Sequence, residues 1–120
     1  EVQMQINEIL AQKKIAFERK SSIITEDTKS SIVQIAKILN DNKTLKVEIA
    51  GHTDSRGEKA LNEKISQDRA NSVKEALISL GVDANRLSTI GYGESFPIAK
   101  DDENGLSEIN RRVEFNILGE

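Results

Sequence analysis

The chain has no cysteine, which excludes disulfides, thiolate metal sites and cysteine nucleophiles without indicating a cellular compartment. Tryptophan is also absent, and the aromatic residues are three phenylalanines and one tyrosine. The chain therefore lacks the stacking platforms that proteins use to bind single-stranded nucleic acid. Its formal net charge of −3, with both signs interspersed, gives no basic stripe. We do not expect nucleic acid as a partner.

No apolar run reaches the roughly 18 residues that a membrane helix needs. The first residue is glutamate rather than methionine, which indicates a processed or excised piece of a longer protein. We therefore expect any contact with a membrane to depend on an anchor or barrel outside these 120 residues. A chain of this length can bury one hydrophobic core, so a single compact domain is expected.

Hydrophobic periodicity predicts alternating helices and strands, which is typical of an α/β (α+β sandwich) fold. Helical spacing predicts helices over residues 2–12, from Thr25 to about residue 41, and from about Glu58 to Leu80. The predicted strands are residues 15–17, 45–50, 86–92 and 111–118. We expect the helices to cover one face of a small, mixed, four-stranded sheet. Residues 1–12 are interpreted as a helical extension of a domain formed by residues 13–120.

The longest predicted helix carries an arginine on its apolar face. At about 100° per residue, its apolar side chains fall within an arc of roughly 160°. Arg69 lies near the middle of this arc, which also contains Asn62. An unpartnered buried guanidinium is costly, so Arg69 must contact a carboxylate, carbonyl groups or a ligand.

The turn before this helix offers a counter-charge to Arg69. Asp54 follows the end of a predicted strand and lies close to the start of the helix. If the two side chains face one cleft, Asp54 can hold an ammonium group while Arg69 holds a carboxylate. The pair then suits a zwitterion, of which an amino acid head group is the simplest. The alternative is a structural salt bridge between Asp54 and Arg69 in a protein–protein interaction domain.

The last predicted strand brings a second arginine toward the same region. Arg111 shares a face with Val113 and Phe115, whereas Arg112 lies on the opposite face and is expected to be solvated or paired on the surface. Two inward arginines and one aspartate are consistent with a cleft.

Catalytic interpretations of the turn are weaker. His52 and Asp54 have too few companions for a metal site, since the chain has one histidine and no cysteine. Ser55 lies too close in sequence to both residues for the three to align as a catalytic triad. The turn also lacks the glycine spacing and lysine of a phosphate loop. We expect no enzyme activity, metal or cofactor, and a hydrolase is the weakest option.

Several short motifs are spaced along the chain. In chain order they are GHTDSRG at residues 51–57, Asn62, Ile65-Ser66, Arg69-Ala70, GYGE at residues 91–94, PIA at residues 97–99 and NRRVE at residues 110–114. Together they resemble the OmpA-like peptidoglycan-binding domain, which also occurs in Pal lipoproteins and in the MotB stator protein. The resemblance extends from about Ile15 to Leu118. It implies a βαβαββ fold and non-covalent binding of cell-wall peptidoglycan.

The resemblance also implies roles for individual residues. In the family, the aspartate and arginine that match Asp54 and Arg69 hold the diaminopimelate of the stem peptide. The other matching pocket residues are Thr53, Leu61, Asn62 and Arg111. The implied location is the periplasmic side of the outer membrane of a Gram-negative bacterium, where the domain anchors the membrane or a membrane complex to the wall. The sequence leaves open whether two copies form a homodimer.

The sequence departs from the family pattern in three places. Ile65 replaces the usual leucine, and Leu106 stands where many members have arginine. Residues 18–20, with the sequence Glu-Arg-Lys, are more charged than the common pattern. The edge of the expected pocket near these residues is therefore left unassigned.

Overall fold

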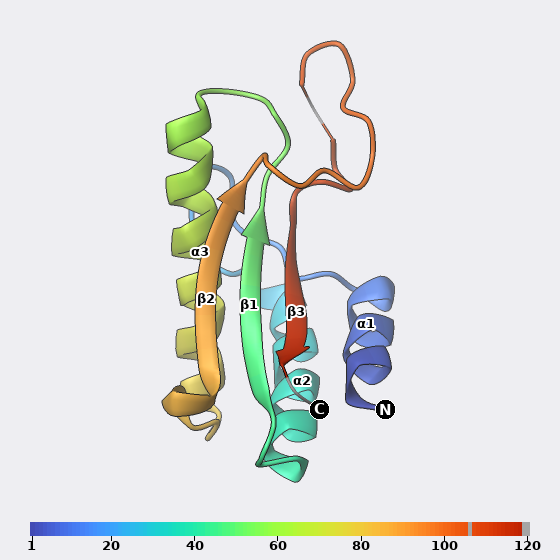
Figure 1. Cartoon of the computed structure of the whole chain (residues 1–120), viewed down its shortest axis with the longest axis vertical. Coiled ribbons are helices and arrows are strands. Elements are labelled where there is room, and N and C mark those ends of the chain that lie inside the picture. The colour runs from blue at the N-terminus through green and yellow to red at the C-terminus, as the bar shows by residue number, and fades with distance from the viewer. Residues whose placement is uncertain (106, 119–120) are drawn as a thin grey trace.

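The computed structural model describes residues 1–105 and 107–118, which form three helices and three strands (Figure 1). The elements are α1 (Val2–Gln12), α2 (Lys29–Asp41), β1 (Lys46–His52), α3 (Lys59–Ser79), β2 (Leu87–Gly93) and β3 (Arg112–Leu118). Short 3-10 turns precede α2 at Glu26–Thr28 and β2 at Ala84–Arg86. None of the helices in the described residues is long and apolar enough to cross a membrane.

The strands form a mixed sheet with the order β2-β1-β3, in which β1 is parallel to β2 and antiparallel to β3. The central position of β1 is marked by Ile49, which is opposite Thr89 on one side and Phe115 on the other. The parallel pair is joined by α3, as such a crossover requires. The predicted α+β architecture with a mixed sheet is confirmed.

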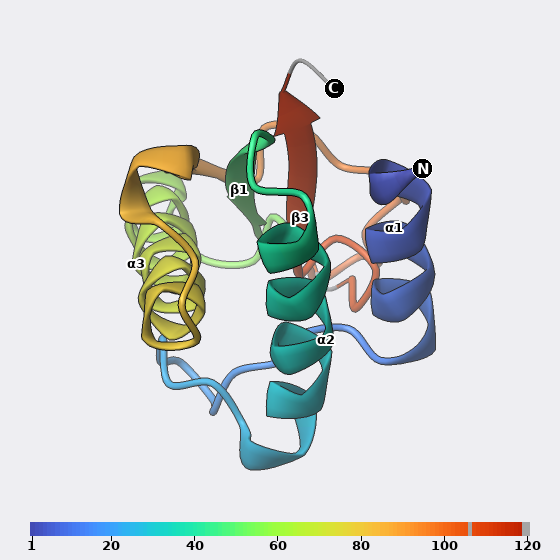
Figure 2. The same cartoon turned by 90° about the horizontal axis from the view of Figure 1, so that it is seen from below.

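The helices lie on one face of this sheet, as Figure 2 shows. Val47, Ile49 and Phe115 point into the resulting core and are at most 1% exposed. Alternate residues of β1 point to the other face, on which none of the described helices lies, and this explains the period of two in its sequence. The prediction of helices on a single face is confirmed.

Two glycines allow α3 to pack directly on the sheet. A Cβ atom added at Gly51 would lie 2.2 Å from the carbonyl oxygen of Ser66, and one at Gly91 would lie 2.3 Å from the amide nitrogen of Gln67. Neither position can accept a side chain unless the backbone moves. The short distance brings the N-terminal half of α3 against the end of β1, where the turn to Asp54 begins.

The prediction of a fourth strand at residues 15–17 is wrong for the described residues. This segment makes an isolated antiparallel bridge, Phe17 to Ile24, and does not join the sheet. Its backbone bonds to the segment that follows, because Thr25 donates to the carbonyl of Ala16 at 3.0 Å and Glu18 donates to that of Ile23 at 2.8 Å. The result is a local hairpin beside α3.

The outer edge of β3 is contacted instead by α1. The side chain of Gln3 donates to the carbonyl of Phe115 at 2.8 Å and accepts from the amide of Ile117 at 2.9 Å. Val2 and Ile6 of the same helix are buried in the core. By satisfying edge groups with a side-chain amide, α1 makes β3 a poorer template for pairing with another chain.

Candidate functional site

A cleft of about 860 Å³ opens at the carboxyl end of β1. Its walls are the turn after β1, the first half of α3, the hairpin near residue 17 and the segment that leads into β3. All six residues that the sequence assigned to a ligand line this cleft: Thr53, Asp54, Leu61, Asn62, Arg69 and Arg111. The predicted convergence of Asp54, Arg69 and Arg111 on one cleft is confirmed, whereas their roles toward a ligand stay predictions.

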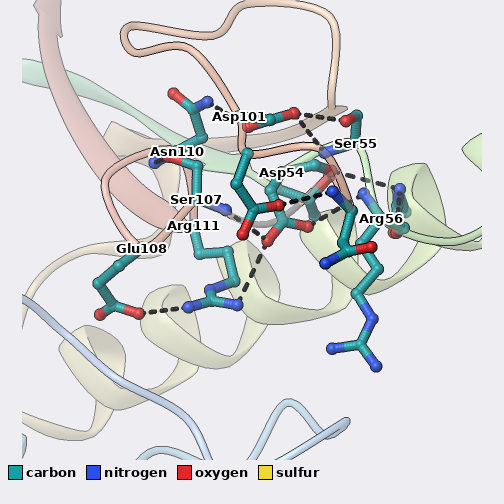
Figure 3. Close-up of polar contacts among 12 residues, drawn as sticks. Asp54, Ser55, Arg56, Asp101, Ser107, Glu108, Asn110 and Arg111 are labelled. Atoms are coloured by element: carbon teal, nitrogen blue, oxygen red, sulfur yellow. Dashed lines mark hydrogen bonds and ion pairs between the residues drawn. The ribbon is translucent and has the colours of Figure 1, made fainter.

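Asp54 is the buried anionic group of the cleft, with a side chain only 7% exposed (Figure 3). One carboxylate oxygen accepts from the backbone amide of Arg56 at 3.2 Å. The other accepts from the amide of Ser107 at 3.1 Å and from a guanidinium nitrogen of Arg111 at 3.2 Å. Because an ionised carboxylate has about four acceptor positions, these three bonds leave room for one further donor.

Arg111 bridges two carboxylates and is therefore already engaged (Figure 3). Besides Asp54, its guanidinium pairs with Glu108 at 2.6 Å. Lys14 pairs with the same Glu108 at 2.6 Å and also donates to the backbone carbonyl of Arg111 at 2.9 Å. Hydrogen bonds from Lys14 and Arg111 lower the pKa of Glu108 below its usual value, so this carboxylate stays charged. The network fixes the wall opposite α3.

Arg69 is held differently, by groups that carry no charge. Its Nε donates to the carbonyl of Ser21 at 2.8 Å, and its guanidinium carbon lies 5.0 Å from the centre of the Phe17 ring. No partner of its two terminal nitrogens is present among the described residues, although they belong to a half-buried side chain. Burial and the nearby Arg111 lower the pKa of Arg69, while the field of Asp54 raises it.

The alternative of a structural Asp54–Arg69 salt bridge is wrong for this structure. In the described residues, the ion pair of Asp54 is formed with Arg111. The reason is positional: Arg111 immediately precedes β3, which begins at Arg112 and not at residue 111 as the sequence indicated. Because Arg111 lies outside the strand, its side chain pairs with Asp54. Arg69 instead donates a hydrogen bond to the carbonyl of Ser21 in the hairpin.

Arg112 is paired, as expected, but it is far less solvated than a surface residue. Its side chain is 11% exposed and pairs with Glu114 at 2.6 Å. It also donates to the carbonyl of Phe96 at 3.0 Å. These contacts place Arg112 in the structural framework on the other face of β3.

The turn that carries Asp54 is held by a second loop. Asp101 accepts hydrogen bonds from both the amide and the hydroxyl of Ser55, as Figure 3 shows. The same carboxylate accepts from the side chain of Asn110 at 2.8 Å. Asn110 is fully buried and also bonds three backbone groups at Ile98 and Ala99. Loop and turn therefore support each other and fix the position of Asp54.

Asn62 supports the same turn from α3. Its amide nitrogen donates to the carbonyl of Arg56 at 3.0 Å and to the carboxylate of Glu94 at 3.2 Å. Thr53 is buried and donates from its hydroxyl to the carbonyl of Asp54 at 2.8 Å. Leu61, in contrast, is 61% exposed at the rim, so the first turns of α3 direct an apolar side chain to the cleft rather than the core.

His52 is a packed residue. Its ring is buried and stacks on Tyr92, with centroids 5.2 Å apart. Neither ring nitrogen has a hydrogen-bond partner among the described residues. Burial and the neighbouring Arg112 lower its pKa. The described residues contain no group of three or more side chains suited to a metal ion.

Sequence reasoning missed several residues that build the cleft. The contacts of Lys14, Phe17 and Asp101 join segments far apart in the chain, and none of these residues follows a periodic pattern. The sequence does contain a signal for Phe17. It is one of only three phenylalanines, and it precedes residues 18–20, which are more charged than the family pattern. Leu106, another departure, lies outside the described residues.

The fold and the cleft define a small α+β domain that presents a charged, ligand-sized site at the carboxyl end of its central strand. Residues 16–111 match the OmpA family, and the chain belongs to this family.

Solved structures and sequence relatives agree with this assignment. The peptidoglycan-associated lipoprotein from Burkholderia pseudomallei superposes with a TM-score of 0.81 at 27% identity, covering 98% of this chain and 100% of that one. The C-terminal domain of Helicobacter pylori MotB gives a TM-score of 0.77 at 31% identity, covering 90% and 85%. Outer membrane porin F of Pseudomonas fluorescens is 36% identical over 86% of this chain and 32% of its own length. The chain thus spans about a third of that porin.

Proposed function

We propose that this chain binds peptidoglycan non-covalently and contributes no catalysis. The ligand group is the amino acid head group of diaminopimelate in the stem peptide, with its ammonium on Asp54 and its carboxylate on Arg69. The observation that carries the proposal is the state of Arg69. Arg69 lines a cleft that also holds a buried carboxylate, and its terminal nitrogens have no hydrogen-bond partner among the described residues. A planar donor fork is suited to a carboxylate.

The relatives support the same function. The chain belongs to the OmpA family, and one of its structural neighbours is named a peptidoglycan-associated lipoprotein. A relative of 33% identity from Mesorhizobium japonicum carries the same name. On this basis the domain acts at the periplasmic side of the outer membrane of a Gram-negative bacterium. There it ties the membrane, or a membrane complex, to the wall.

The affinity of one such site should be modest, because the cleft is open and its contacts are few. Attachment to a polymeric wall would gain from repeated ligand groups and from any linked second domain. Anchoring therefore does not require a tight individual complex.

Sedimentation with purified peptidoglycan sacculi tests the proposal. The wild-type domain should co-sediment, whereas Asp54→Asn and Arg69→Ala should each remain largely in the supernatant. Circular dichroism and urea unfolding establish that both variants are folded. Arg86→Lys is the matched control, since it alters another partly buried arginine away from the cleft. Unchanged co-sedimentation of both folded cleft variants would refute the site.

A further inference from the structure

Basic residues outnumber acidic residues along the cleft, although the whole chain has a net charge of −3. Three of the lining carboxylates are already paired: Asp54 with Arg111, Glu108 with Arg111 and Lys14, and Asp68 with Lys64. Four basic lining residues (Arg19, Lys20, Arg56 and Arg69) and one acidic one (Glu58) form no ion pair among the described residues. The cleft therefore carries positive charge that its own acids do not balance.

Two of these unbalanced charges lie at the tip of the hairpin near α3, in the departure from the family pattern. Arg19 and Lys20 are both exposed at the tip. The tip is closed by hydrogen bonds from the amide and the hydroxyl of Ser21 to the carbonyl of Glu18, each 3.0 Å long. Lys20 has a φ of +56°, a left-handed conformation that is uncommon for residues other than glycine. This turn directs both basic side chains to the rim of the cleft.

The hairpin is attached to the arginine that is proposed to bind the ligand. Arg69 donates to the carbonyl of Ser21 and lies over the ring of Phe17, so it contacts the hairpin on both sides of the tip. Figure 2 shows the corresponding segment, in light blue, reaching α3. The basic tip and the guanidinium of Arg69 are thus parts of one surface.

We infer that Arg19 and Lys20 form a second subsite, which binds a further carboxylate of the ligand beside the head group held by Asp54 and Arg69. The inference rests on the proposed function and adds a selectivity to it. A zwitterionic head group carries no net charge, so it leaves the positive charge at the hairpin tip unbalanced. A stem peptide with another free carboxylate supplies the missing negative charge. The domain therefore prefers acidic stem peptides over their amidated forms.

The test compares two synthetic peptides by calorimetry. One is alanyl-γ-glutamyl-diaminopimelate, which carries the free glutamyl carboxylate, and the other has that carboxylate converted to an amide. The head group is the same in both. Because exposed ion pairs are individually weak, we expect the wild-type domain to bind the acid form roughly five- to tenfold more tightly at low salt. The preference should shrink as salt is added.

The double variant Arg19→Gln/Lys20→Gln should lose this preference and bind both peptides as the wild-type domain binds the amide. The control Lys43→Gln/Lys46→Gln removes the same charge from exposed positions around the start of β1, at the end opposite the cleft, and should keep the full preference. Equal affinity of the wild-type domain for the two peptides would overturn the inference, as would an unchanged preference in the double variant. Failure to bind either peptide would instead refute the proposed function on which the inference rests.

Discussion

Two partly buried arginines of this chain are held by backbone carbonyls, but to different extents. Arg86 donates from Nε to the carbonyl of Leu45 at 2.9 Å, and from one terminal nitrogen to those of Leu39 and Asn42 at 2.8 Å each. Arg69 donates from Nε alone, to Ser21. The guanidinium of Arg86 joins the end of α2 to the start of β1, whereas that of Arg69 retains its terminal donors for another group.

The difference separates a structural arginine from one available to a ligand. Both residues satisfy the requirement that a buried guanidinium find acceptors, so burial alone does not distinguish them. The number of occupied donors distinguishes them, because a ligand carboxylate needs the two terminal nitrogens of the guanidinium.

The largest effect is expected from Arg86→Ala, which removes three charge-assisted hydrogen bonds to the end of α2 and the start of β1. The free energy of unfolding should fall by about 3 kcal/mol, measured by urea denaturation. Lys43→Ala changes an exposed residue between α2 and β1, the segment that Arg86 contacts, and should alter the free energy of unfolding by less than about 0.5 kcal/mol. Folded Arg86→Ala protein should still sediment with sacculi. Loss of binding without loss of stability would break the distinction.

Arg69→Lys should show the opposite pattern. Lysine retains the charge but lacks the planar pair of donors and the bond to Ser21. We expect the affinity for diaminopimelate to fall about tenfold, while the free energy of unfolding falls by only about 1 kcal/mol. Calorimetry and urea unfolding measure the two quantities. If the variant kept full affinity and lost as much unfolding free energy as Arg86→Ala, Arg69 would be a structural arginine like Arg86.

A smaller effect is expected from Phe17→Leu, which removes the ring beneath the guanidinium of Arg69 but keeps an apolar side chain. Cation–π contacts at partly exposed sites contribute about 0.5–1 kcal/mol, so the affinity should fall roughly two- to fivefold. Arg86 has no such ring contact among the described residues, and its contribution to stability should be unaffected. Unaltered affinity in Phe17→Leu would show that the ring does not orient Arg69.

The smallest effect concerns the pH dependence of the free energy of unfolding. The pKa of His52 is lowered in the folded state by burial and by Arg112. Below about pH 6.5 the unfolded chain therefore binds a proton that the folded chain resists, and stability is lost as the pH falls from that value. His52→Gln should flatten this part of the curve of unfolding free energy against pH. An unchanged slope in the variant would assign the dependence to other groups.

Much of the site could be predicted because it depends on local patterns. The position of Asp54 after β1 and that of Arg69 on α3 follow from strand alternation and helical periodicity. The ion pair of Asp54 could not be predicted in this way. It depends on where β3 begins, and a shift of one residue decides whether Arg111 belongs to the strand or to the cleft.

The predicted sheet had one strand too many, and this error also arises because tertiary contacts decide the outcome. The apolar segment ending at Phe17 is indistinguishable by composition from a short edge strand. Its pairing partner is the adjacent Ile24 rather than the sheet, and the edge of β3 is contacted by Gln3 of α1. Such competition between possible partners for a strand edge is decided by tertiary contacts.

The central claim is that the terminal nitrogens of Arg69 bind the ligand carboxylate while its Nε stays on Ser21. NMR spectra of the arginine side chains, recorded during titration with diaminopimelate, test this most directly. On binding, the terminal N–H signals of Arg69 should shift and exchange more slowly with water, while those of Arg86 stay unchanged. Saturating binding that leaves the Arg69 signals in place would contradict this claim.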